Sequence, residues 1–129
     1  MTTNTNQPTN NQTQKPTILL VTERFKLQSK SFRVIAYKLP DGKTTVTVRQ
    51  MAITVRKQPK TAKDFLKRLG ISPITARMPN CCVADMVYLS TVIDYFRDLN
   101  ESGRGNIRTL LGQEFLTKHL LEEEAKNNR

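Results

Sequence analysis

Seven basic side chains between positions 49 and 68 are the residues of this sequence with the clearest potential chemistry. They are Arg49, Arg56, Lys57, Lys60, Lys63, Lys67 and Arg68. Positive side chains attract the phosphates of nucleic acids, and an arginine can also donate two hydrogen bonds to guanine in the major groove. We therefore expect these residues to contact double-stranded DNA. The lysines would neutralise phosphates, and Arg68 could read a base.

Two short amphipathic helices would carry these charges. Hydrophobic residues recur at helical spacing in two consecutive sets. The sets are Val48, Met51, Ala52 and Val55, then Ala62, Phe65, Leu66 and Leu69. The second helix would expose Lys60, Lys63, Asp64, Lys67 and Arg68. This layout matches a helix-turn-helix, whose second helix enters the major groove. An ordinary domain with two solvated helices would give the same pattern.

The expected helix ends carry residues that suit them. In segments 47–50 and 61–64 a threonine stands three positions before Gln or Asp, the spacing of a capping box. Pro59 would end the first helix, because proline has no amide hydrogen to donate. Gly70 can adopt the left-handed conformation that ends many helices.

The net charge of +10 is unevenly distributed along the chain. Residues 15–77 contain 15 Lys or Arg against three acids, a balance of +12, whereas residues 78–129 contain six against eight, a balance of −2. A basic surface of this size favours polyanionic partners. The basic helices lack the aromatic-rich apolar face of a helix that lies on a membrane. We therefore expect nucleic acid as the partner and no membrane association.

Two features of the sequence predict a cytoplasmic protein. No apolar run is long enough to span a bilayer, and the N-terminus does not have the composition of a secretory signal. The two cysteines, Cys81 and Cys82, are adjacent, and neighbours in sequence rarely form a disulfide with each other. We expect both cysteines to be reduced and buried, since the unoxidised residue is usually buried.

The whole pattern predicts an α+β fold with one domain over residues 17–126, after a disordered polar tail at 1–16. A β-hairpin is expected from strands at 31–38 and 44–48, joined by a turn at Pro40-Asp41-Gly42. Residues 17–21 could form a first strand, 23–30 have no clear pattern, and 71–82 read as a loop with a short strand at 74–78. Helices are expected at 83–99 and 107–126.

The two C-terminal helices have broad hydrophobic stripes. Met86, Leu89, Ile93 and Phe96 mark the first, and Ile107, Leu110, Leu111, Phe115, Leu120 and Leu121 should face inward in the second. Asn106 can cap the second helix, and we expect Glu122, Glu123 and Glu124 to be solvated. We also expect these helices to pair two copies, because a two-fold dimer suits palindromic DNA half-sites.

The titratable residues do not favour an enzyme. The single histidine, His119, stands near the end of a helix, and the chain contains no nucleophile motif and no metal-ligand spacing. Asp94 and Asp98 could share a helix face, as in a nuclease with two carboxylates, but solvated helix charges explain them more simply. We expect no catalytic residue, no metal and no cofactor.

Residues 33–70 resemble a known family. The stretch RVIAYKLPDG, a β segment, VRQMAITV and then DFLKRLG is similar to the N-terminal domain of phage antirepressors of the BRO-N and KilA-N type. It also resembles uncharacterised cyanobacterial proteins with the same opening pattern. The resemblance implies an α+β domain that binds DNA.

These observations predict a DNA-binding transcription regulator of phage or plasmid type that uses the helix-turn-helix-like pair. A second reading is a non-enzymatic interaction module, either an inhibitor or an adaptor, whose basic face covers an acidic protein. Binding to a protein without affinity for DNA would distinguish the second reading from the first.

Overall fold

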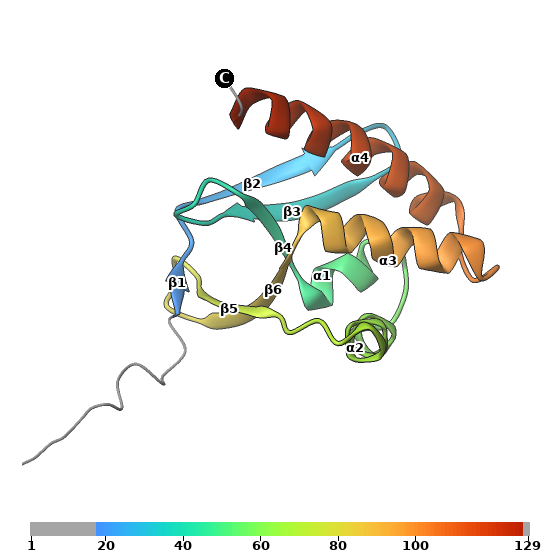
Figure 1. Ribbon diagram of the computed structural model, residues 1–129, viewed down its shortest axis with the longest axis horizontal. Coiled ribbons are helices and arrows are strands. Elements are labelled where there is room, and N and C mark those ends of the chain that lie inside the picture. Colours follow the sequence, from blue (N-terminus) through green and yellow to red (C-terminus); the bar gives the residue numbers. More distant parts are fainter. Residues whose placement is uncertain (1–17, 128–129) are drawn as a thin grey trace, which may run out of the picture.

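A computed structural model describes residues 18–127, so the predicted tail at 1–16 lies outside the described residues (Figure 1). Within them the fold is α+β, as predicted. The elements in chain order are β1 Leu19–Leu20, β2 Glu23–Gln28, β3 Arg33–Lys38, β4 Thr44–Thr47, α1 Val48–Ile53, α2 Pro59–Leu69, β5 Ile74–Arg77, β6 Val83–Tyr88, α3 Leu89–Glu101 and α4 Ile107–Asn127.

The six strands form one curled sheet in the order β1-β5-β6-β4-β3-β2. All neighbouring strands are antiparallel except β1 and β5, which are parallel. The outermost strands, β1 and β2, follow one another in the chain, so the segment between them joins the two ends of the sheet. The amide of Val21 donates to Arg77 on β5 at 3.0 Å, and that of Thr22 donates to Lys38 on β3 at 2.9 Å. These bonds hold the sheet in its curl (Figure 1).

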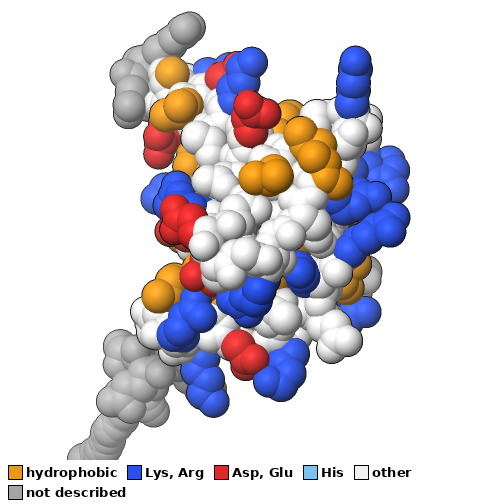
Figure 2. Space-filling model, turned by 90° about the vertical axis from the view of Figure 1, so that its right-hand side faces the viewer, with side chains coloured by type: hydrophobic (Ala, Val, Ile, Leu, Met, Phe, Trp, Pro, Cys, Tyr) orange, Lys and Arg blue, Asp and Glu red, His pale blue; other side chains and the backbone are white. Residues whose placement is uncertain are grey.

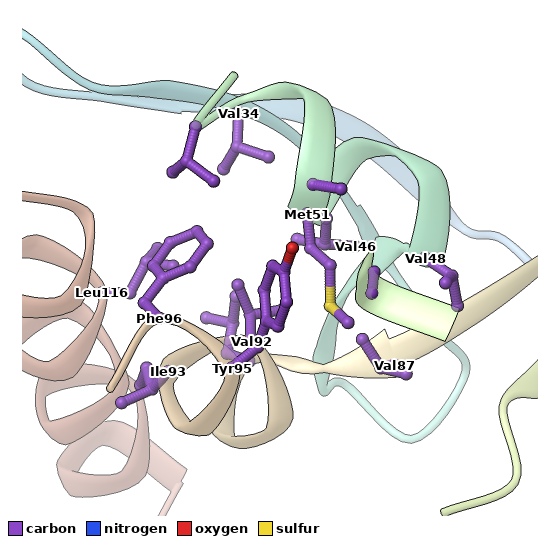
Figure 3. Close-up of a cluster of buried hydrophobic side chains, with 14 of the residues drawn as sticks. Val34, Val46, Val48, Met51, Val87, Val92, Ile93, Tyr95, Phe96 and Leu116 are labelled. Atoms are coloured by element: carbon purple, nitrogen blue, oxygen red, sulfur yellow. The ribbon is translucent and has the colours of Figure 1, made fainter. Parts of the chain in front are cut away.

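Each face of the sheet packs on its own hydrophobic cluster. The larger cluster lies between the sheet and the helices, where Val34, Val46 and Val87 meet Met51 and Phe96 (Figure 3). The smaller cluster fills the inside of the curl. It contains Tyr37, Leu39, Ala76 and Met86, with partly buried residues packed against them. Because β-strand side chains alternate between faces, neighbouring residues of β6 serve both clusters.

The predicted β-hairpin is confirmed as β3 and β4. Asp41 Oδ1 accepts from the Lys43 amide at 2.8 Å, and Gly42 takes a positive φ of 83°. These are the roles that Asp and Gly play in tight turns. The short strand expected at 74–78 is also confirmed, as β5. β2 was not predicted. It alternates Phe25 and Leu27 toward the larger cluster with polar residues on the other face.

The prediction of a helix at 83–99 is wrong for its first six residues, which form β6. Val83–Tyr88 is a central strand, and pairs with β4 on one side and β5 on the other. Met86 fits a helical stripe, but it lies inside the curl of the sheet and is fully buried. Strand pairing with two distant segments outweighs the local helical pattern. The remaining part of the predicted helix is α3.

The burial predicted for Cys81 and Cys82 is also wrong, because both side chains are exposed. They belong to the turn that joins β5 to β6. The Met78 amide donates to the Cys82 carbonyl at 2.7 Å, and Cys81 has a positive φ of 72°. A tight turn at the end of a hairpin leaves its side chains in solvent.

The last helix is confirmed, and Phe115 and Leu120 pack against the larger cluster as predicted, but the rest of its buried face was wrongly predicted. Asn106 caps α4 by accepting from the Thr109 amide at 3.0 Å. The buried face contains Thr109, Gly112 and Leu116 rather than the predicted Ile107, Leu110 and Leu121, which are 56–64% exposed. A Cβ on Gly112 would stand 2.7 Å from a Phe32 ring atom, so glycine lets α4 approach the core closely.

Glu123 was expected in solvent and instead binds the sheet. Its carboxylate accepts from Lys38 Nζ at 3.0 Å and from the Thr44 hydroxyl, and only 12% of its side chain is exposed. Burial by itself raises the pKa of Glu123. The hydrogen bonds from Thr44 and Lys38, with the positive charges of Lys38 and His119, outweigh burial and hold this pKa below its ordinary value.

This pKa shift predicts how acid affects stability. A carboxylate with a depressed pKa stabilises the fold above its unfolded pKa of about 4.3 and loses this contribution as the pH falls through its lower folded value. We therefore expect Glu123→Gln to reduce the free energy of unfolding at pH 7 and to differ progressively less from wild type below about pH 4.3. Urea unfolding across pH measures this, with exposed Glu122→Gln as the control. An undiminished Glu123→Gln effect at pH 3 would contradict the assignment.

Candidate nucleic-acid interface

The helix α1 is short, and both of its ends are built by local bonds. Thr47 accepts from the Gln50 amide at 3.0 Å, which confirms the first predicted cap. At the other end, the amides of Arg56 and Lys57 donate to the carbonyls of Ile53 and Ala52, each at 2.9 Å. This pattern places Arg56 in the left-handed conformation, with a φ of 62°. Glycine usually occupies that position at a helix end.

The second predicted cap is wrong, because α2 begins at Pro59 and not after Thr61. Gln58 is the N-cap residue, and Pro59 occupies the first turn, where its missing amide hydrogen costs nothing. The Thr61 hydroxyl instead lies 2.5 Å from the phenol oxygen of Tyr95 on α3. Burial raises the pKa of Tyr95, which keeps its phenol protonated and able to donate. Gly70 ends α2 with a φ of 70°, as predicted.

Two of the seven predicted DNA contacts are engaged in ion pairs. Lys60 pairs with Asp64 one turn along α2 at 2.9 Å, and both side chains are largely exposed. Arg68 pairs at 2.9 Å with Asp98 on α3, which also binds Arg104 at 3.3 Å. Arg68 therefore faces α3 in this structure. Asp98, considered above as a nuclease carboxylate, bridges two arginines.

Three other predicted residues, Arg49, Lys63 and Lys67, surround one cavity of about 520 Å³, which we call the α2 groove. Its lining residues are Thr47, Val48, Arg49, Lys63, Leu66, Lys67, Ile71, Ser72, Pro73, Ala84 and Asp85. None of the three cations is in an ion pair within the described chain, although Asp85 is nearby. The remaining two predicted residues, Arg56 and Lys57, lie on the connection between α1 and α2.

A second basic cavity, of about 360 Å³, was not predicted. We call it the hairpin pocket, because residues of the paired strands β2 and β3 line it. It is lined by Lys26, Arg33, Val34, Ile35, Gln50, Thr54 and Arg108. Within residues 18–127, none of its three cations is in an ion pair, and neither Asp nor Glu lines it. An adjoining hollow of about 590 Å³ shares Arg33 and Arg108 and adds Lys30. The alternation of apolar and polar residues along β2 is the sequence signal that could have placed Lys26 on an exposed strand face.

The two cavities lie on either side of α1. Gln50 and Thr54 line the hairpin pocket, whereas Val48 and Arg49 line the α2 groove. Together they make a basic surface that crosses α1. Figure 2 shows one face of the molecule, on which Lys and Arg gather along the right-hand edge and are interspersed with Asp and Glu elsewhere.

Other kinds of site have little support in the described part of the chain. Residues 18–127 bring no three His, Cys, Asp or Glu side chains together in a group that could hold a metal ion. No helix in the same range is both long enough and apolar enough to cross a bilayer.

Comparison with protein-family models, curated proteins and solved structures finds no match to this chain. The resemblance of residues 33–70 to phage antirepressor domains stays a prediction.

The left-handed conformation of Arg56 gives a stability prediction. A residue with a Cβ in this region costs on the order of 1–2 kcal/mol. Glycine relieves this strain, but the larger entropy of glycine in the unfolded state cancels part of the gain. We expect Arg56→Gly to raise the free energy of unfolding by about 0.5–1 kcal/mol. The neighbouring Lys57→Gly should lower it, because Lys57 has no such strain to relieve. Denaturant unfolding of both variants measures the difference, and equal losses would show that Arg56 makes a stabilising contact.

Proposed function

We propose that this protein binds double-stranded DNA through the basic surface that crosses α1. The observation that carries the proposal is that, within residues 18–127, six cations beside α1 are in no ion pair: Arg49, Lys63 and Lys67 on one side, and Lys26, Arg33 and Arg108 on the other. Neutralising phosphates releases counterions from DNA, which favours binding at low salt.

The proposed contacts extend the predicted set. Arg49, Lys63 and Lys67 would neutralise phosphates next to α2, and Arg33 and Arg108 would do so beside the hairpin. Arg56 lies on the connection that leaves α1. Its retention of a strained conformation fits a functional position, where such strain often concentrates. Arg68 would need to leave Asp98 before reading a base.

The proposed role is transcription regulation, and the proposed location is the cytoplasm, where a phage or plasmid regulator would meet its DNA. The charge distribution supports this role, since each of the two cavities flanking α1 is lined by three basic side chains. The predicted resemblance of residues 33–70 to BRO-N-type domains agrees with this role. The helix-turn-helix reading of α1 and α2 is part of the same proposal.

The first test is fluorescence anisotropy with a random duplex over a series of salt concentrations. The slope of log K against log salt is about −0.9 per phosphate contact, so Lys63→Ala/Lys67→Ala should make the slope shallower by roughly 1.8. The control Lys118→Ala/Lys126→Ala removes the same charge from exposed positions on α4 and should barely change the slope. Arg33→Ala/Arg108→Ala should resemble the first variant if DNA crosses α1.

Each outcome of this experiment is decisive. Equal slopes for the α2 variant and the α4 control would show that the protein binds through diffuse charge and not through this surface. A wild type that does not bind at about 50 mM salt, where phosphate contacts are favoured, would overturn the proposal. An acidic protein surface would then be the partner to test.

The proposed DNA-binding unit is a homodimer formed through the C-terminal helices. Ile107, Leu110 and Leu121 lie on the exposed side of α4, within about 60° of one another around the helix axis. Covering them with a second copy would remove this apolar area from water. A two-fold dimer would also present two basic surfaces to DNA.

We expect analytical ultracentrifugation at micromolar concentration to find a dimer. Leu110→Ser/Leu121→Ser should shift it to monomer, because both side chains would leave the interface. Leu69→Ser removes a similarly exposed leucine from α2 and should leave the dimer intact. A monomeric wild type would contradict this part of the proposal without affecting the basic surface.

A further inference from the structure

The α2 groove has a feature that DNA binding does not require, namely an apolar wall. Val48 from α1, Leu66 from α2 and Ala84 from β6 line it, together with Ile71 and Pro73 from the segment after α2. Its volume of about 520 Å³ lies within the usual range for small-molecule sites, which are mostly apolar with a few polar groups. Phosphate groups would gain nothing from such walls.

The polar groups at the groove are strongly biased in charge. Arg49, Lys63 and Lys67 line it against one carboxylate, Asp85. Lys63 and Lys67 are four residues apart on α2, so they are neighbours of like charge on one side of the helix. A ligand with a negative group and an apolar body would match both the cations and the walls.

Local structure holds the groove in shape without a ligand. Gly70 ends α2 in the left-handed conformation, and the Ile71 amide donates to Leu66 at 2.9 Å, which fixes the direction of the segment that follows. Pro73, two residues after Ile71 in the same segment, further restricts the backbone there. Thr47 caps α1 on the opposite side. A preformed site avoids the entropic cost of ordering its walls on binding.

We propose that the α2 groove binds a small organic anion with an apolar body, such as an alkyl or aryl carboxylate. The anionic group lies among Arg49, Lys63 and Lys67, and the apolar body lies against Val48, Leu66 and Ile71. The anion binds to cations that also belong to the proposed DNA-binding surface, so the ligand and DNA compete for them. This competition rests on the proposed function, whereas binding of the anion itself does not.

The experiment uses two probes that differ mainly in charge. 1-Anilinonaphthalene-8-sulfonate carries an anionic group on an apolar body, and N-phenyl-1-naphthylamine is a neutral counterpart. Fluorescence titration of the full chain without DNA should give saturable one-to-one binding of the sulfonate and weaker binding of the neutral probe. Lys63→Ala/Lys67→Ala should lower the affinity for the sulfonate roughly three- to tenfold, in line with the loss of two exposed ion pairs. The affinity for the neutral probe should not change.

Two further variants test the location. Asp85→Asn should tighten sulfonate binding, because it removes the one carboxylate that lines the groove. Ser72→Trp places a large side chain at the exposed rim and should abolish binding, while Lys118→Ala retains it. The proposal would be overturned if Ser72→Trp bound the sulfonate with the affinity of wild type. It would also be overturned if both probes bound equally and Lys63→Ala/Lys67→Ala changed neither affinity.

Displacement identifies the occupant and separates this proposal from DNA binding. Decanoate should displace the sulfonate, whereas displacement by an acidic leucine-containing peptide at lower concentration would assign the groove to a protein segment and overturn the small-anion proposal. Duplex DNA at low salt should also displace it. If decanoate displaces the probe and DNA does not bind, the groove proposal stands and the proposed function fails. If DNA binds and the sulfonate does not, the proposed function stands and the groove proposal fails.

Discussion

The position of β6 between β4 and β5 is the constraint on which the rest of the structure depends. This strand pairs on both sides, and its neighbouring residues Met86 and Val87 are buried in different hydrophobic clusters. The chain leaves the sheet after β4 and returns through β5, with β6 inserted between them. Both α1 and α2 must therefore fit in the connection beside this strand. The α2 groove forms where α2 and β6 face each other, since Leu66 and Ala84 both line it.

Several acids of this protein engage basic side chains that lie outside the two cavities flanking α1. Asp64 engages Lys60, Asp98 engages Arg68 and Arg104, and Glu123 engages Lys38. Each of these carboxylates lies on or beside α2, α3 or α4, and in the described chain none of them lines the two cavities flanking α1. In the described residues, the cations that line these cavities are therefore in no ion pair, and the same holds for Arg24, Lys43 and Arg77. Exposed ion pairs are individually weak, so their effect here is to direct side chains more than to stabilise the fold.

Elements with strong local signals were predicted from the sequence, and elements that depend on distant partners were not. The turn at Asp41 and Gly42 is chemically determined by those residues, and the hairpin around it was predicted. β6 has a pattern compatible with a helix, and pairing with segments about 10 and 40 residues away decides its conformation. The most buried positions of α4 were missed in part because Thr109 and Gly112 are small or polar. Glycine there permits contact with Phe32, which no sequence pattern records.

The candidate site was only partly predictable for the same physical reason. Arg49, Lys63 and Lys67 lie within one helical hairpin, so local periodicity was enough to suggest a shared surface. Arg33 and Arg108 are 75 positions apart in sequence and line the same pocket only because the start of α4 lies beside the connection between β2 and β3. The Asn106 side chain donates to the Val55 carbonyl at 2.9 Å, which ties the start of α4 to the end of α1. Since α1 lines both cavities, a ligand that shifts this short helix in one of them would also change the other.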